Sequence, residues 1–156
     1  MTDTAARQTA IIHLSAAAPV FLVSDVNATA EWYAEHLGFE TAGIFPPQSP
    51  AGWASLQRDR VEIMLQRLPR YRKPDLYRRR RGGVWDAYIR MSGVHALYAT
   101  LHEQPFIRMP LTKQPYGDWE FEVVDLNGYV LVFGGDETLG AVPEPQVVGP
   151  PILGQP

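Results

Sequence analysis

Short apolar runs separated by proline, glycine and charged residues predict strands in the first half of the chain. One helix interrupts them. Asp25 can cap a helix that starts near Asn27, and Gly38 is a good C-terminal stop. Strands are predicted on both sides of this helix, at 19–24, 40–45, 53–57 and 61–65. The first half therefore reads as one strand, one helix and three strands.

The second half repeats this order. A strand is predicted at 86–91 and a helix at 94–103, and three more strands follow at 107–111, 120–124 and 129–133. A shift of 68 residues lays Ala18 on Asp86 and Met64 on Val132. Sequence identity across this shift is low, so the repeat is one of pattern, and such a duplication strongly constrains the fold.

Each half can curl its strands into a half-open sheet with its helix outside. The predicted fold class is α+β, with two βαβββ modules, about 18–68 and 85–135, that form a half-open, cup-shaped mixed sheet. Strand alternation places every second side chain in the cup. The predicted cup positions are Ala18, Val20, Leu22, Glu62, Met64, Gln66, Asp86, Tyr88, Arg90, Val130, Val132 and Gly134.

Composition narrows the class of protein. The 156 residues are 46% hydrophobic and 20% charged, which is typical of a globular protein. A net charge of −3 is too weak to predict a nucleic-acid or membrane partner. No cysteine is present, which excludes disulfides, thiolate metal ligands and a cysteine nucleophile. We expect a cytoplasmic protein, because the N-terminus lacks a signal pattern and the apolar stretches are too short to span a bilayer.

Two segments are set apart by composition from a predicted single domain at 11–140. Residues 1–10 are small and polar, and residues 141–156 are rich in proline and glycine, so both are expected to be tails. The basic run 67–81 contains two tyrosines among its cations and could bind phosphates or single strands. Its place in the junction 67–84 between the modules favours a solvated linker that crosses the mouth of the cup.

Two motifs resemble the vicinal-oxygen-chelate superfamily, which includes glyoxalase I, fosfomycin-resistance enzymes, extradiol dioxygenases and bleomycin-resistance proteins. VSDVNATAEWYAEHLGF at 23–39 resembles its first strand and helix. PYG, EF, Asp125 and Asn127-Gly128 resemble the closing hairpin of the bleomycin-resistance branch. The resemblance covers about residues 18–135, and Leu126 departs from it where a proline is usual.

The resemblance also assigns four metal-ligand positions, and here the chain departs from the enzymes. The positions are Ala18, Met64, Asp86 and Val132. Alanine and valine have no donor atom, a thioether suits hard divalent metals poorly, and one carboxylate does not hold a metal tightly. The four histidines lie on predicted helices or before the first strand. We therefore expect no metal, no other cofactor and no catalytic residue.

An apolar and aromatic cup with a few charges is typical of a small-molecule pocket. The sequence predicts a metal-independent homodimer that binds an aromatic antibiotic or metabolite. The expected ligand-binding residues are Trp53, Met64, Asp86, Tyr88, Arg90, Phe106, Tyr116 and Trp119. Asp86 and Arg90 could instead form ion pairs with each other or with Glu62; we favour recognition of a polar ligand.

Two other functions stay open. One is a glyoxalase- or dioxygenase-like enzyme of the same superfamily, a lyase, isomerase or oxygenase, with Asp86 as its best acid or base. The other is an interaction module whose cup is filled by its own side chains.

Overall fold

The computed structural model describes residues 12–136, and within them the chain forms two modules of the same design. The first module contains β1 (Val20–Val23), α1 (Val26–Leu37), β2 (Glu40–Phe45), β3 (Trp53–Arg58) and β4 (Val61–Arg67). The second contains β5 (Ala87–Arg90), α2 (Val94–Leu101), β6 (Ile107–Lys113), β7 (Trp119–Val124) and β8 (Val130–Gly135). The predicted tails at 1–10 and 141–156 lie outside the described residues.

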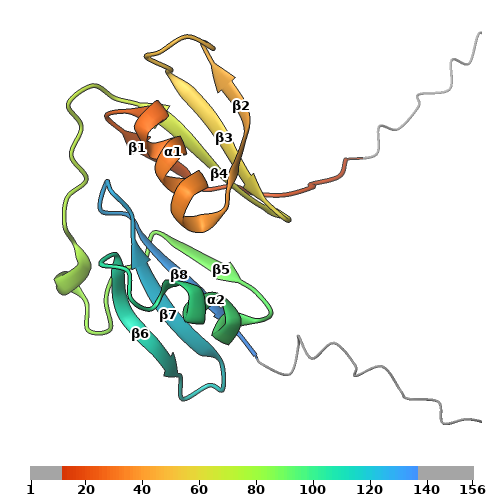
Figure 1. The fold of residues 1–156 in the computed structure, drawn as a ribbon, viewed down its shortest axis with the longest axis vertical. Helices are drawn as coiled ribbons and strands as arrows, with labels where there is room; N and C mark the ends of the chain where they lie inside the picture. Colours follow the sequence, from red (N-terminus) through yellow and green to blue (C-terminus); the bar gives the residue numbers. More distant parts are fainter. Residues whose placement is uncertain (1–11, 137–156) are drawn as a thin grey trace, which may run out of the picture.

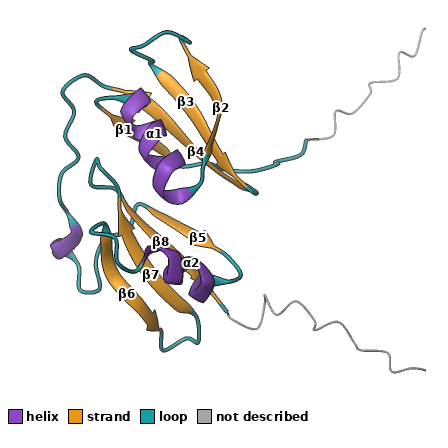
Figure 2. Ribbon diagram, viewed as in Figure 1, coloured by secondary structure: helices purple, strands orange, loops and turns teal. Residues whose placement is uncertain are grey.

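Both modules have the same sheet topology, which confirms the predicted fold class. The strand orders are β1-β4-β3-β2 and β5-β8-β7-β6. The β1–β4 and β5–β8 pairs are parallel, with Val20 opposite Met64 and Tyr88 opposite Val132, and the remaining pairs are antiparallel. Figure 1 shows the two open sheets one above the other, and Figure 2 shows one helix packed on each.

The helix boundaries follow local capping chemistry. The carboxylate of Asp25 accepts the amide N–H of Ala28 at 2.9 Å, and Gly38 ends α1 in the left-handed conformation at φ 66°. The second helix stops at Leu101, two residues before its predicted end. A turn in which the amide of Gln104 donates to the carbonyl of Leu101 replaces the last helical turn, and Pro105 disfavours helical geometry before it.

The helix-facing sides of the two sheets share one apolar core. Phe21 of β1 and Tyr129, just before β8, stack with ring centroids 4.1 Å apart. Trp32 of α1 packs edge-on against Phe106 at 5.2 Å. The two modules are therefore joined through residues on the sides that carry the helices.

The opposite side of each sheet is called here the concave face. In the first module it is open: Val20 is 48% exposed, whereas its neighbour Phe21, which points to the helix side, is buried. In the second module it is covered, and Val132 is fully buried. The linker between the modules, residues 68–86, provides part of this cover. None of the helices in 12–136 is both long and apolar enough to cross a membrane.

Candidate functional site

Two carboxylates lie on the concave face of the second module. The pairing of β7 with β8 places Glu120 opposite Gly134 and Glu122 opposite Val132, so both point away from α2. Glu120 is 1% exposed and Glu122 is fully buried. Burying a carboxylate is costly unless it is hydrogen-bonded or paired with a cation. The surroundings of these two groups therefore define the chemistry of this face.

The carboxylate of Glu122 is satisfied at both oxygens by the linker. The indole N–H of Trp85 donates to Oε1 at 2.8 Å, and the hydroxyl of Tyr77 donates to Oε2 at 2.5 Å. Tyr77 lies in the short 3₁₀ helix Tyr77–Arg79, and the guanidinium of Arg108 stacks on its ring, 3.6 Å from the centroid. Partial burial and the bond to Glu122 raise the pKa of Tyr77. The linker is thus fastened across the concave face.

The carboxylate of Glu120 is satisfied on one side only. The hydroxyls of Tyr88 and Tyr116 both donate to Oε1, at 2.9 and 2.6 Å. Oε2 is buried and has no hydrogen-bond partner within residues 12–136. Loss of solvent around the hydroxyl and the bond to Glu120 raise the pKa of Tyr116 to about 12. The same two causes raise the pKa of Tyr88. Both phenols are therefore neutral donors near pH 7.

A glycine makes room for this arrangement. A Cβ atom on Gly134 would lie 2.8 Å from Cγ of Glu120 and still closer to the hydroxyl of Tyr88. No side chain fits there without displacing one of them. Arg90 lies at the rim, 3.2 Å from the carboxylate of Asp118 and 5.4 Å above the ring of Tyr88. The site thus combines a buried acceptor, aromatic rings and a charged rim.

Asp86 has a structural role at the start of β5. Its Oδ2 accepts the amide N–H of Val130 at 2.8 Å and lies 3.1 Å from Nζ of Lys73 in the linker. Glu62 accepts the hydroxyl of Ser55 at 2.6 Å. The ion pairs considered for Asp86 and Arg90, with each other or with Glu62, are therefore wrong. Lys73 and Asp118 are nearer in space and supply the opposite charges.

The eight predicted ligand-binding residues do not form one cluster. They lie on the second module's sheet around Glu120 and Asp86, on the concave face of the first module, and on the helix side. Three of them, Tyr88, Arg90 and Tyr116, gather around Glu120, and Asp86 lies at the end of the same sheet. Strand pairing puts Trp53 and Met64 on the concave face of the first module.

Phe106 and Trp119 lie on the helix side and not in the predicted cup. The ring of Trp119 packs edge-on against His95 of α2 at 4.7 Å, and Phe106 contacts Trp32 of α1. The reason is alternation along β7, where Trp119 and Phe121 point to α2 and Glu120 points to the opposite face.

The most informative residues, Glu120 and Glu122, were missing from the predicted site. The sequence contained a signal for them. Once Val132 is assigned to the cup, its antiparallel partner across the hairpin must face the cup as well, and that partner is Glu122. Tyr77 could not be found in this way, because its position depends on the path of the linker.

The four positions that the resemblance assigns to a metal do not fit one. Ala18 and Val132 offer no donor, and Asp86 is already bonded to Lys73 and to the amide of Val130. Within 12–136 no group of three or more histidine, aspartate or glutamate side chains is placed so that it could hold a metal ion.

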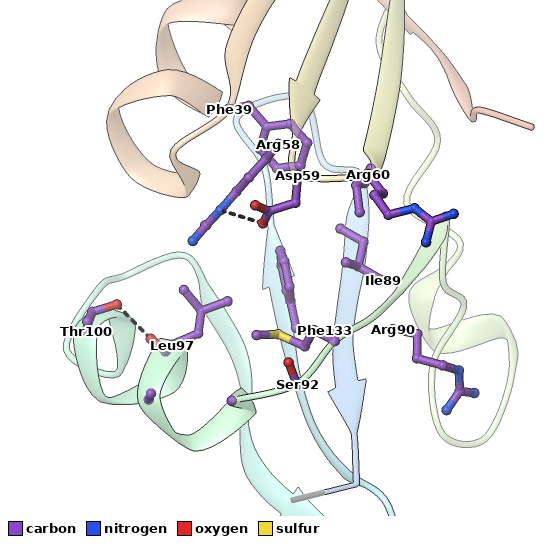
Figure 3. A pocket seen from close by; sticks show the side chains of 14 residues that line it. Phe39, Arg58, Asp59, Arg60, Ile89, Arg90, Ser92, Leu97, Thr100 and Phe133 are labelled. Atoms are coloured by element: carbon purple, nitrogen blue, oxygen red, sulfur yellow. Dashed lines mark hydrogen bonds and ion pairs between the residues drawn. The ribbon is translucent and has the colours of Figure 1, made fainter. Parts of the chain in front are cut away.

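A separate cavity of about 780 Å³ lies between the modules. Its walls come from the β3–β4 turn, β5 and the start of α2, and Figure 3 shows Leu97 and Phe133 among its apolar residues. Arg58 lies at the edge of this cavity, and its Nη1 donates a hydrogen bond of 2.6 Å to the carbonyl of Leu37. Of the predicted site residues, only Arg90 borders it. The buried oxygen of Glu120, to which no group within 12–136 donates, makes the concave face the stronger candidate.

Known proteins support the assignment of the fold. A comparison with curated proteins gave no match. Among solved structures, TioX from Micromonospora sp. ML1 is 20% identical with a TM-score of 0.59, covering 78% of this chain and 95% of TioX. The bleomycin-binding protein of bleomycin-producing Streptomyces verticillus, solved with copper(II)-bleomycin, is 20% identical with a TM-score of 0.57, covering 79% and 97%.

A bleomycin resistance determinant encoded on the transposon Tn5 is 23% identical with a TM-score of 0.58, covering 80% of this chain and 99% of its own. At these identities the likeness establishes the fold. The model of the Glyoxalase/Bleomycin resistance protein/Dioxygenase superfamily matches residues 11–133, most of the chain. The protein therefore belongs to the glyoxalase/bleomycin resistance protein/dioxygenase superfamily.

Proposed function

We propose that this protein is a metal-independent small-molecule-binding protein whose aromatic ligand occupies the concave face of the second module, around Glu120. The observation that carries the proposal is the carboxylate of Glu120, which is buried but has one oxygen to which no group of the described residues donates. Tyr116 beside it is 64% exposed. A buried acceptor next to an exposed aromatic ring offers a polar anchor and a stacking surface together.

Two further observations support this proposal. Structures with this fold include the S. verticillus protein with copper(II)-bleomycin and a second bleomycin-binding protein complexed with bleomycin. Metal independence is supported by Ala18 and Val132, whose side chains cannot ligate. A sequestering role toward an antibiotic or a metabolite is part of the proposal.

The enzymatic alternative has less support. Its best acid or base was Asp86, and that carboxylate is engaged by Lys73 and by the amide of Val130. A group fixed in this way stabilises the junction of linker and sheet. It is poorly placed to exchange a proton with a substrate.

We further propose a two-fold homodimer in which a second copy covers the concave face of the first module. This face exposes apolar side chains, including Val20, Leu22 and Phe45, which is 70% exposed. Exposed apolar side chains on one face of a sheet favour an interaction site. Sedimentation at micromolar concentration should give the mass of two chains, and the mass of one chain would refute the dimer.

Binding is tested by a thermal-shift screen of aromatic compounds that include cations, anions and neutral molecules. Hits are then titrated by tryptophan fluorescence, because Trp85 donates to Glu122 beside the site. Tyr116→Ala should weaken a hit by about 1–3 kcal/mol through loss of stacking. Tyr98→Ala, on α2, is the control. A screen without hits, or hits that bind Tyr116→Ala as tightly as the parent, would refute the proposed site.

Metal independence needs its own measurement. The purified protein is dialysed against a chelator, and its zinc, nickel, manganese and iron are quantified by elemental analysis. We expect unchanged affinity for a hit after dialysis. One tightly held metal per chain, together with loss of binding when it is removed, would refute this part of the proposal.

A further inference from the structure

Glu120 and Glu122 differ in how their carboxylates are completed. They lie two positions apart on the same face of β7 and are equally buried. Glu122 receives one donor at each oxygen, from Tyr77 and Trp85. Glu120 receives two donors at Oε1 and none at Oε2. Of the two, only Glu120 has an oxygen to which no group within residues 12–136 donates.

The protein also leaves the charge of Glu120 unbalanced. Within 12–136 neither glutamate forms an ion pair with a lysine or an arginine, and the nearby cations are engaged elsewhere. Arg90 pairs with Asp118, Lys73 pairs with Asp86, and Arg108 stacks on Tyr77. Tyrosine hydroxyls stabilise a carboxylate but do not neutralise it. A buried carboxylate of this kind attracts a cation that can also donate a hydrogen bond.

Tyr116 is the exposed partner of Glu120. This residue lies in the turn between β6 and β7, which is closed by the amide of Gln114 donating to the carbonyl of Asp118 at 2.8 Å. Tyr116 is 64% exposed, and its hydroxyl donates a hydrogen bond of 2.6 Å to Oε1. Tyr116 is not part of the apolar core, so movement of its side chain would leave that core intact.

We propose that Oε2 of Glu120 binds a protonated nitrogen of the ligand, an ammonium or amidinium group attached to an aromatic ring that stacks on Tyr116. This inference rests on the proposed function and specifies the chemical class of its ligand. An anionic ligand would meet an unneutralised carboxylate and is disfavoured. A neutral donor completes the hydrogen bond without balancing the charge.

The test compares three probes that share one ring and differ in charge: 2-naphthylmethylammonium, 2-naphthylmethanol and 2-naphthoate. Their affinities for the full chain are measured by calorimetry at pH 7. We expect the ammonium to bind about 10-fold or more tightly than the alcohol, because both can donate to the carboxylate but only the ammonium also balances its charge. The carboxylate should bind most weakly.

Two matched variants locate the effect. Glu120→Gln should weaken the ammonium about 10- to 100-fold and change the alcohol little. Glu122→Gln removes a charge from the same face, at a carboxylate whose oxygens already have donors, and should keep the preference for the ammonium. Tyr116→Phe keeps the stacking ring and should therefore also keep the preference for the ammonium. Thermal melts confirm that each variant is folded.

The results separate this inference from the proposed function. Equal affinity for the ammonium and the alcohol would overturn the inference, and the function would stand if that binding depends on the ring of Tyr116. Glu120→Gln with unchanged preference for the ammonium would overturn it as well. If Glu120→Gln does not fold, the order of the three probes on the parent protein decides. If no probe binds, the inference fails, while the charge-unbiased screen decides the function independently.

Discussion

The hydroxyl of Tyr33 on α1 donates a hydrogen bond of 3.0 Å to Oδ2 of Asp125, in the turn between β7 and β8. The bond is buried and joins residues 92 positions apart. Oδ1 of the same carboxylate accepts the amide N–H groups of Asn127 and Tyr129, both at 2.8 Å. Burial, opposed by these bonds, raises the pKa of Asp125 above its ordinary value. One carboxylate therefore shapes the last hairpin and attaches it to the first module.

Tyr33→Phe should lower the free energy of unfolding by about 1–3 kcal/mol, because it leaves one oxygen of Asp125 buried without its donor. Urea unfolding followed by tryptophan fluorescence gives the change. Tyr98→Phe is the control, since the hydroxyl of Tyr98 makes no hydrogen bond in the described part of the chain. Equal stability of the two variants would show that the contact between Tyr33 and Asp125 contributes nothing.

The linker should open when Tyr77 is removed. Tyr77→Ala deletes the bond to Glu122 and the surface on which Arg108 stacks, which together hold the segment against the sheet. Local opening should become about 10-fold more frequent, given about 1.5 kcal/mol for such a bond. The rate of trypsin cleavage measures this opening, because arginines occupy positions 78–81 of the linker.

Leu76→Ala is the matched control in the same segment, because the side chain of Leu76 is half-exposed and makes no hydrogen bond. Cleavage should be mapped by mass spectrometry under conditions in which the sheets stay folded. Identical cleavage rates in the parent and in Tyr77→Ala would mean that the linker is held by other contacts.

Gly134→Ala should destabilise the second module by about 1–3 kcal/mol, the usual cost of overpacking. The added methyl group would collide with the hydroxyl of Tyr88 and with Cγ of Glu120, 2.8 Å away. Gly52→Ala is the control, because a Cβ there meets its nearest atom, the carbonyl oxygen of Phe45, at an ordinary 3.6 Å. Thermal melts of both variants would contradict the prediction if Gly52→Ala were the more destabilised.

Stability should decline in strongly alkaline solution. Burial and hydrogen bonds raise the pKa of five tyrosines in the folded protein, Tyr33, Tyr77, Tyr88, Tyr116 and Tyr129. The stabilisation that they provide is complete below the ordinary tyrosine pKa near 10. It is lost as the pH rises through the folded values, because the unfolded chain releases protons that the folded chain keeps. A buried tyrosine such as Tyr33 contributes a slope of about 1.4 kcal/mol per pH unit.

Urea unfolding at several pH values between 8 and 12 gives this slope. Tyrosinate absorbance of the native protein should remain low at pH 10 and should lose a component near pH 12 in Tyr116→Phe. A native titration curve that matched the urea-unfolded protein would disprove the raised pKa values.

Local sequence signals were sufficient for most of the fold. Asp25 and Gly38 mark the ends of α1, and alternation in β1 separates buried Phe21 from exposed Val20. These features depend on neighbours in the chain, through capping and the two-residue period of a strand. The repeated order of elements then determined the two modules.

Tertiary structure alone decided which groups meet on the concave face. The sequence determined that Glu120 and Glu122 share a strand and a side. It did not determine that Tyr77, 45 residues before Glu122, would satisfy one carboxylate while Oε2 of the other received no donor from residues 12–136. Hydrogen bonds between distant side chains depend on the path of the linker, which has no periodic pattern to read. The candidate site is the place where those long-range contacts leave one buried charge incomplete.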